Sequence, residues 1–172
     1  MKISFIGTGL MGYPMAKKLL LKKLNLKIFS RTLEKAKPLE EFGGKVESSL
    51  GETVKDSDII FTMLTDDFAV EKVLGNSEFL KNLKPSSTVV DMSSIKPKIA
   101  IKHGNLLKKK NINFLDAPVS GGTIGAEQGS LAIMVGGDQK IYDNVFDIFK
   151  IMGNPTLVGP IGSGQISKLA NQ

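Results

Sequence analysis

Hydrophobic residues follow two alternating patterns along the chain. Short, nearly continuous apolar runs alternate with longer segments in which apolar positions recur every three or four residues. The short runs predict strands with both faces buried, as in residues 58–64 (DIIFTML), and the longer segments predict amphipathic helices. The predicted strands are residues 3–6, 24–29, 45–47, 58–64, 88–92, 113–117, 131–135 and 156–158.

The segments between these strands carry helix starts and ends. Pro14 lies near the first turn of the first helix, and Gly43 and Gly44 close the second, whereas the glycine-rich stretch after residue 117 predicts an irregular loop. Strands that alternate with helices predict an α/β fold, a doubly wound, mostly parallel sheet with helices on both faces. The predicted helices are residues 15–21, 33–42, 68–74, 97–110 and 139–151, with one more beginning near residue 164.

Composition limits the kinds of site that the chain can form. The 172 residues, 41% of them hydrophobic, are enough for one domain and a short appendage. The absence of cysteine excludes disulfides and thiolate metal sites, and a single histidine, His103, cannot form a histidine cluster. Gly7 and Gly9 interrupt the first apolar run, and no segment is long enough to cross a membrane. We therefore expect a metal-free cytoplasmic protein.

The net charge of +6 raises the question of nucleic-acid binding. The lysines cluster at residues 17–18, 22–23 and 108–110, at the ends of predicted helices, where cations complement the helix dipole. No aromatic residues that could stack on bases are interleaved with them. Solvated helix ends are the favoured interpretation, and a nucleic-acid patch is the alternative.

The sequence FIGTGLMG places Gly7, Gly9 and Gly12 in the spacing G-x-G-x-x-G. The motif follows a predicted strand and opens a predicted helix, which is the context of a dinucleotide-binding turn. The first glycine permits the tight turn, the second lets the backbone approach a pyrophosphate, and the third lets helix and strand pack closely. A turn with a purely structural role is the alternative.

The end of the second strand indicates which dinucleotide is bound. NAD enzymes of this fold carry an acidic residue there, which binds the adenosine ribose, whereas this chain has Ser30, Arg31 and Thr32. No carboxylate would repel a 2′-phosphate, and Arg31 can pair with one. The sequence therefore predicts NADP as the cofactor, with NAD as the alternative if Arg31 is an ordinary loop residue.

Two further stretches suggest a substrate site. Gly121, Gly122, Gly125 and Gly129 crowd the loop that follows a predicted strand end, beside Ser120, and successive glycine amides can bind an anion such as a substrate carboxylate. The alternative is a loop that needs positive φ angles. In GSGQISKLANQ, Lys168 offers an amine that could exchange a proton with a carbonyl oxygen, although an exposed helix residue is the simpler interpretation.

Four motifs in this order resemble the β-hydroxyacid dehydrogenase family, which includes 3-hydroxyisobutyrate dehydrogenase, tartronate semialdehyde reductase and, more distantly, 6-phosphogluconate dehydrogenase. They are GTGLMG (7–12), DMSS (91–94), DAPVSGG (116–122) and GSGQISKLANQ (162–172). The resemblance implies a Rossmann-like domain over residues 1–163 and a helix from 164 that leads to an all-helical second domain. That second domain is absent from the sequence, so we expect the chain to bind NADP(H) but to turn over substrate poorly.

The resemblance also assigns roles to individual residues. Lys168 would be the catalytic acid and base, and Asn171 would orient the substrate, although many relatives place this asparagine where the chain has Gln172. Ser120, Gly121 and Gly122 would hold the substrate carboxylate. The implied cofactor-binding residues are Gly7, Thr8, Gly9, Leu10, Met11, Gly12, Ser30, Arg31, Thr32, Met63, Leu64, Thr65 and Ser93.

The expected function is therefore hydride transfer between NADP(H) and a short 3-hydroxyacid or its semialdehyde. A small carboxylate would be the only partner besides the cofactor, with neither nucleic acid nor membrane, and the full-length protein would be a homo-oligomer. A noncatalytic dinucleotide-binding module is the alternative, and Lys168 discriminates against it, since such a module has little use for an amine at this position.

Overall fold

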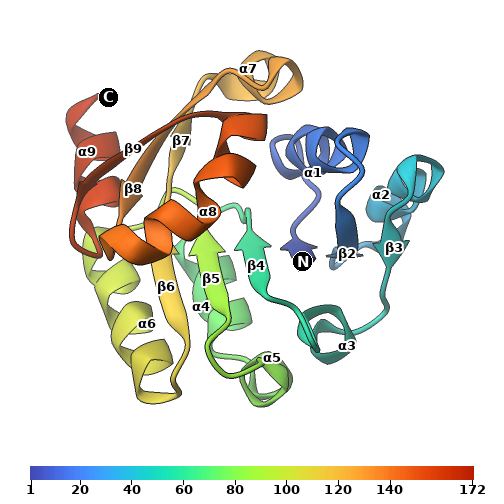
Figure 1. Ribbon diagram of the computed structural model, residues 1–172, viewed down its shortest axis with the longest axis horizontal. Helices are drawn as coiled ribbons and strands as arrows, with labels where there is room; N and C mark the ends of the chain where they lie inside the picture. Colours follow the sequence, from blue (N-terminus) through green and yellow to red (C-terminus); the bar gives the residue numbers. More distant parts are fainter.

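A nine-stranded sheet runs through the protein in the computed structural model, which describes residues 1–172 (Figure 1). Its first six strands are parallel, in the spatial order β3-β2-β1-β4-β5-β6. The order reverses at β1, and ligands of such sheets bind there, beyond the carboxyl ends of the strands. These strands are β1 Lys2–Ile6, β2 Asn25–Phe29, β3 Lys45–Val46, β4 Ile59–Thr62, β5 Thr88–Asp91 and β6 Asn113–Asp116.

The last three strands make the sheet mixed. β8 (Leu131–Gly136) runs antiparallel to β6 and to β7 (Val119–Ser120), and parallel to β9 (Gly153–Gly159). β6 and β7 pair with β8 in one continuous register, so they follow one another along the same edge of β8. The prediction of a mostly parallel sheet is confirmed, with the antiparallel part confined to the region after β6.

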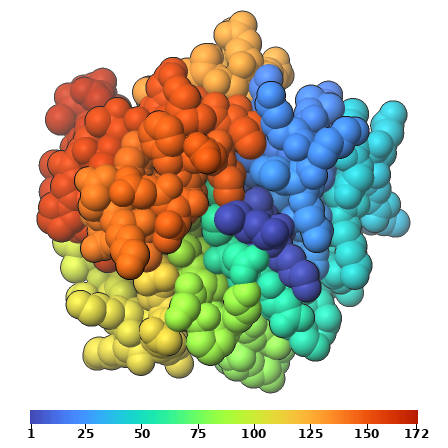
Figure 2. Space-filling model, in the orientation of Figure 1, coloured from blue at the N-terminus to red at the C-terminus, as the bar shows by residue number.

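Two hydrophobic cores lie on opposite faces of the sheet. Adjacent strand residues point to opposite faces, so that Phe5 belongs to one core and Ile6 to the other. Helices α1 (Gly12–Leu21) and α8 (Gln139–Met152) cover the first face, and α4 (Asp67–Leu74) and α6 (Pro97–Lys109) cover the second. In Figure 2, α1 (blue) and α8 (orange) lie side by side. The doubly wound α/β architecture is therefore confirmed.

The predicted helix over residues 33–42 is divided in two. An α-helix, α2 (Leu33–Ala36), is followed by a 3-10 helix, η1 (Lys37–Phe42). Pro38 has no amide hydrogen and cannot continue the α-helical hydrogen-bond pattern, which explains the change. Gly43 then ends η1 with a φ of 96°, in agreement with the predicted helix end.

Three short helices depart from the predicted order of elements. The glycine-rich stretch predicted as an irregular loop contains β7 and α7 (Gly122–Gln128). Helices α3 (Leu50–Val54) and α5 (Ser77–Asn82) were not predicted, because so few turns show no clear periodicity. The last helix, α9 (Ser163–Ala170), follows β9. None of the helices combines the length and apolar character that a membrane-spanning helix needs.

Candidate functional site

The glycine turn connects the end of β1 to the start of α1, at the point where the strand order reverses. Gly7 has a φ of 102°, and its amide donates a hydrogen bond to the Phe29 carbonyl oxygen over 2.9 Å. A side chain on Gly7 would overlap the Met63 carbonyl oxygen, and one on Gly12 would overlap the Gly7 carbonyl oxygen. The turn can therefore lie this close to β4 and α1 only with glycine at both positions.

The outer side of the turn has the properties of an anion site. A Cβ atom on Gly9 would meet no protein atom within 4 Å, so the backbone is open to a ligand at this residue. The hydroxyl of Thr8 is buried and has no hydrogen-bond partner in the protein. An unpaired buried hydroxyl costs about 1–3 kcal/mol. A phosphate that approaches Thr8 and Gly9 would remove this cost, so the residues fit the pyrophosphate of a dinucleotide.

A cavity of about 360 Å³ opens beside the turn, between the ends of β1, β2 and β4 and the start of α4. It brings together nine of the residues predicted to bind the cofactor, although they come from three separate parts of the sequence. They are Gly7, Thr8, Gly9, Ser30, Arg31, Thr32, Met63, Leu64 and Thr65.

The other four predicted cofactor residues lie outside the wall of this cavity. Leu10 is 85% exposed, Met11 packs against the first hydrophobic core, and Gly12 is buried in the start of α1. Ser93 is fully buried, and its hydroxyl accepts a hydrogen bond of 2.8 Å from the amide of Leu64. Ser93 therefore supports the cavity wall from behind.

Two cations that the sequence did not single out line the same cavity. Lys35 on α2 and Lys72 on α4 join Arg31, and the only acidic lining residue is Asp66. The carboxylate of Asp66 accepts a hydrogen bond of 2.8 Å from the amide of Ala69 and so caps α4. Lys35 could have been noticed, because it follows Arg31 by only four residues in the sequence. Lys72 carried no such signal, because it is distant from Arg31 in the sequence and α4 lies beside the cavity only in the folded chain.

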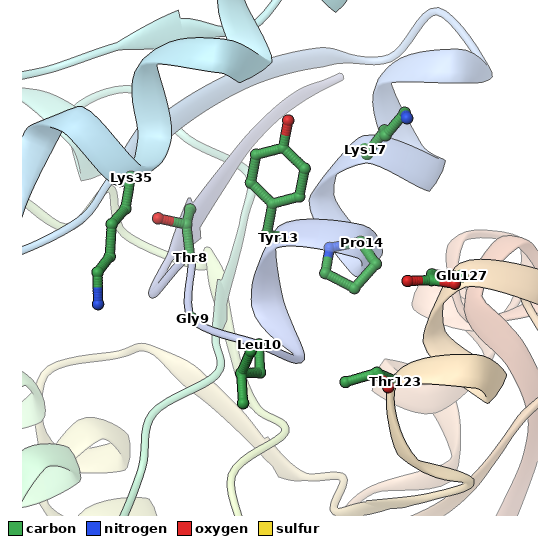
Figure 3. Close-up of a pocket in the computed structure, with 9 residues that line it drawn as sticks. All are labelled: Thr8, Gly9, Leu10, Tyr13, Pro14, Lys17, Lys35, Thr123 and Glu127. Atoms are coloured by element: carbon green, nitrogen blue, oxygen red, sulfur yellow. The ribbon is translucent and has the colours of Figure 1, made fainter.

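A second hollow, of about 770 Å³, lies between the glycine turn, α1 and α7 (Figure 3). Thr8, Gly9 and Lys35 line both hollows, while Thr123 and Glu127 of α7 face the start of α1 across the second one. The ammonium group of Lys17 lies 4.6 Å from the centroid of the Phe42 ring and is engaged there. Arg31 and Lys72 do not line this hollow, so it has fewer cations than the first.

The predicted carboxylate site lies at the junction of β7 and α7. Gly121 and Gly122 have positive φ angles of 136° and 63°, and both residues are exposed, as is Ser120. A Cβ atom on Gly122 would meet no protein atom within 4 Å. The loop thus presents a backbone that a ligand can approach, and it lies outside the walls of both hollows.

Lys168 lies on α9, whose start is attached to the end of β6. The Asp116 carboxylate accepts hydrogen bonds from the amides of Gly162 (2.7 Å) and Gln165 (3.0 Å). Lys168 is half-buried and makes no ion pair. The side-chain amide of Asn171, just after α9, donates to the Met134 sulfur over 3.6 Å.

Two buried carboxyl groups, Asp91 and Asp116, lie at the ends of the neighbouring strands β5 and β6. Asp91 at the end of β5 accepts hydrogen bonds from Thr62 (2.8 Å) and from the amide of Ser93 (3.2 Å), and it pairs in register with Asp116. Burial raises the pKa of Asp91 to about 6, although hydrogen bonds from Ser93 and Thr62 oppose the rise. Burial also raises the pKa of Asp116, against hydrogen bonds from backbone amides.

Residues 2–162 match the family model of the NAD binding domain of 6-phosphogluconate dehydrogenase. The chain belongs to the β-hydroxyacid dehydrogenase family. The resemblance stated from the four motifs is thereby confirmed, and the domain described above is the dinucleotide-binding domain of that family.

Named relatives of the β-hydroxyacid dehydrogenase family match the chain along its whole length. The 2-hydroxy-3-oxopropionate reductase of Escherichia coli is 41% identical over 175 residues, which are 100% of this chain and 59% of that protein. The solved structure of 3-hydroxyisobutyrate dehydrogenase from Mycobacterium tuberculosis, determined with L-serine, superposes with a TM-score of 0.95 at 30% identity, over 99% of this chain and 58% of that one. The chain thus spans about three fifths of these relatives.

A third similar structure contains a bound nicotinamide dinucleotide. Psf3, solved in complex with NADP+, superposes with a TM-score of 0.94 at 26% identity, over 98% of this chain and 61% of that one. The family model and the open, phosphate-compatible turn at Thr8 and Gly9 agree on a nicotinamide dinucleotide as the cofactor.

Proposed function

We propose that this chain is the cofactor-binding part of an oxidoreductase that passes hydride between NADP(H) and a short 3-hydroxyacid or its semialdehyde. The observation that carries the proposal is the cavity between the glycine turn and Arg31, with the unpaired Thr8 hydroxyl at its edge. When bound, the nicotinamide ring supplies or accepts the hydride. The names of the Escherichia coli and Mycobacterium tuberculosis relatives support a substrate of this class.

A preference for NADP over NAD follows from the charges at the adenosine end. The lining of the cavity near β2 contains Arg31 and Lys35, with Lys72 on the facing helix. Arg31 can bind a phosphate with two parallel hydrogen bonds, and the lysines add point charges. No residue of the segment 30–32 carries a carboxylate that would instead bind the ribose hydroxyl of NAD.

The proposed chemistry of the substrate rests on three groups. Lys168 would give a proton to the carbonyl oxygen in reduction and take it back in oxidation. Asn171 would orient the substrate, and the backbone of Ser120, Gly121 and Gly122 would bind its carboxylate. L-serine, present in the structure of the Mycobacterium tuberculosis relative, carries both a carboxylate and a 3-hydroxyl group, which are the groups this arrangement requires.

We place the boundary of the cofactor-binding domain after residue 163 and assign residues 164–172 to the helix that leads out of it. Because the relatives are longer, we propose that catalysis and homo-oligomer formation belong to a protein with a second domain. The present chain would then bind NADP(H) and turn over substrate poorly.

A parallel titration of the chain with NADPH and NADH, followed by nicotinamide fluorescence, tests this proposal. We expect NADPH to bind at least about tenfold more tightly than NADH, because only NADPH carries the 2′-phosphate. Equal affinities would reject the assignment of NADP. Binding of neither nucleotide would reject the dinucleotide site in this chain, and NADPH binding without activity in a two-domain protein would favour the noncatalytic module.

A further inference from the structure

Helix α9, which carries Lys168, is held to the rest of the protein mainly by polar contacts. Its buried residues are Gly164 and Gln165, whereas Ile166 and Leu169 are 57% and 58% exposed. No large apolar side chain of α9 is therefore buried, so hydrophobic packing contributes little to its position. A Cβ atom on Gly164 would overlap the Met134 carbonyl oxygen, which shows how closely the helix approaches β8.

The side chain of Gln165 connects α9 to the segment after β5. It is 1% exposed, and both ends of its amide are engaged. Its nitrogen donates to the Ser93 carbonyl oxygen over 2.8 Å, and its oxygen accepts from the Ile95 amide over 3.0 Å. A buried amide with both groups paired fixes one orientation, since any rotation leaves a polar atom unpaired.

Ser93 extends this connection to the wall of the cofactor cavity. Its hydroxyl accepts a hydrogen bond from the amide of Leu64, one of the lining residues, and its own amide donates to Asp91. The chain of contacts therefore runs from Leu64 through Ser93 to Gln165. Asp116 completes it, because its carboxylate binds the amides of Gly162 and Gln165 at the start of α9.

We infer that Gln165 and Asp116 are positioning residues that hold α9, and with it Lys168, at a fixed place relative to the 63–65 loop of the cofactor cavity. Lys168 follows Gln165 by three residues, and residues at this spacing are neighbours on a helix. A fixed position of Gln165 therefore also fixes the position of Lys168 on α9 and the side of the helix from which its side chain extends. This inference rests on the proposed function, in which Lys168 is the proton donor and acceptor.

The test compares backbone NMR spectra of the wild-type chain and the variant Gln165→Met. Methionine has a similar length and volume but can form neither hydrogen bond. The matched control is Gln139→Met, since Gln139 is exposed on α8 and bonds only to Asp143. Gln165→Glu keeps an acceptor for the Ile95 amide and replaces Gln165→Met if that variant does not fold.

Two quantities are measured in each protein. The first is hydrogen exchange of the α9 amides, which we expect to be at least about tenfold faster in the Gln165 variant and unchanged in the control. The second is the change in the backbone NMR signal of Lys168 when NADP+ is added. In the Gln165 variant we expect this change to be at least about threefold smaller than in the wild type, while the affinity for NADP+ changes less than about twofold. Asp116→Asn should act in the same direction, because its amide group opposes one of the two backbone donors.

The outcomes separate this inference from the proposed function. Unchanged exchange in α9 would overturn the positioning role, and so would faster exchange with an unchanged Lys168 response, which would make Gln165 merely structural. A wild-type chain that does not bind NADP+ would instead reject the proposed function. In that case the exchange of α9 alone decides whether Gln165 and Asp116 hold the helix.

Discussion

In the proposed site, the choice of cofactor would depend on a single residue, Arg31. It lies just after β2, lines the cavity beside Thr32, and occupies the region where related folds carry a carboxylate. The proposed preference for NADP depends on the charge at one position, so it can be proposed from the sequence once the second strand is located. Lys35 and Lys72 would strengthen the same preference, and their place in the cavity lining is known only from the structure.

We expect Arg31→Ala to weaken the binding of NADPH and to leave the binding of NADH nearly unchanged. Hydrogen bonds between a guanidinium and a phosphate contribute about 1.5–3 kcal/mol, or roughly tenfold to hundredfold in affinity. Fluorescence titration measures both affinities. Lys109→Ala is the control, because it removes one exposed positive charge at the end of α6. An equal loss for both nucleotides would show that Arg31 does not bind the 2′-phosphate.

At the scale of elements, the glycine turn is a junction in which each glycine has a different neighbour. Gly7 lies against the Met63 carbonyl, Gly12 lies against the Gly7 carbonyl, and Gly9 faces no protein atom. The motif predicted three roles from spacing and context, and the contacts of Gly7 and Gly12 agree with the two roles that concern packing. Protein packing requires glycine at Gly7 and Gly12, and the proposed cofactor requires it at Gly9.

We expect Gly9→Ala and Gly12→Ala to separate binding from folding. The methyl group at Gly9 meets no protein atom, so thermal stability should stay near the wild-type value while NADPH affinity falls at least about tenfold. The methyl group at Gly12 would overlap a backbone oxygen, so that variant should lose about 1–3 kcal/mol of stability. Circular dichroism and fluorescence titration measure the two effects. Full NADPH affinity in Gly9→Ala would contradict the proposed approach of the pyrophosphate.

The differences between predicted and observed elements also have local causes. The helix over residues 33–42 changes type at Pro38, and α3 and α5 are too short to show a periodicity. Helix α7 was hidden because its sequence, GTIGAEQ, contains two glycines, which lower helix propensity. It forms because Gly125 and Ala126 are buried against the first face of the sheet.

At the scale of the whole molecule, the buried carboxyl group of Asp91 couples the stability of the fold to pH. Its pKa is raised from 3.8 to about 6, chiefly by burial, so the folded chain retains this proton at pH values where the unfolded chain has lost it. The contribution of Asp91 to the free energy of unfolding is fully present below pH 3.8 and is lost as the pH rises through about 6. Burial lowers the pKa of His103, so the contribution of this residue to stability is lost as the pH falls, opposite to that of Asp91.

We expect Asp91→Asn to gain stability over the wild type as the pH rises through about 6, by on the order of 3 kcal/mol at neutral pH. Asparagine keeps the oxygen that accepts from Thr62 and Ser93 but carries no charge. Urea denaturation across this pH range measures the difference, in which the contribution of His103 cancels. The exposed Asp147→Asn is the control, and a pH-independent difference between wild type and Asp91→Asn would contradict the burial argument.

The main strands and the longer helices, the mostly parallel α/β architecture, the glycine turn and the family could all be predicted from the sequence. These features depend on local periodicity and on glycines at fixed spacing, which can be recognised in a single sequence. The tertiary structure was needed to find that Leu64, Ser93, Asp116 and Gln165 form one chain of contacts, and that Lys72 lines the cavity. Hydrogen bonds and burial between residues so far apart in sequence exist only after the sheet has assembled, because its strand order brings their ends together.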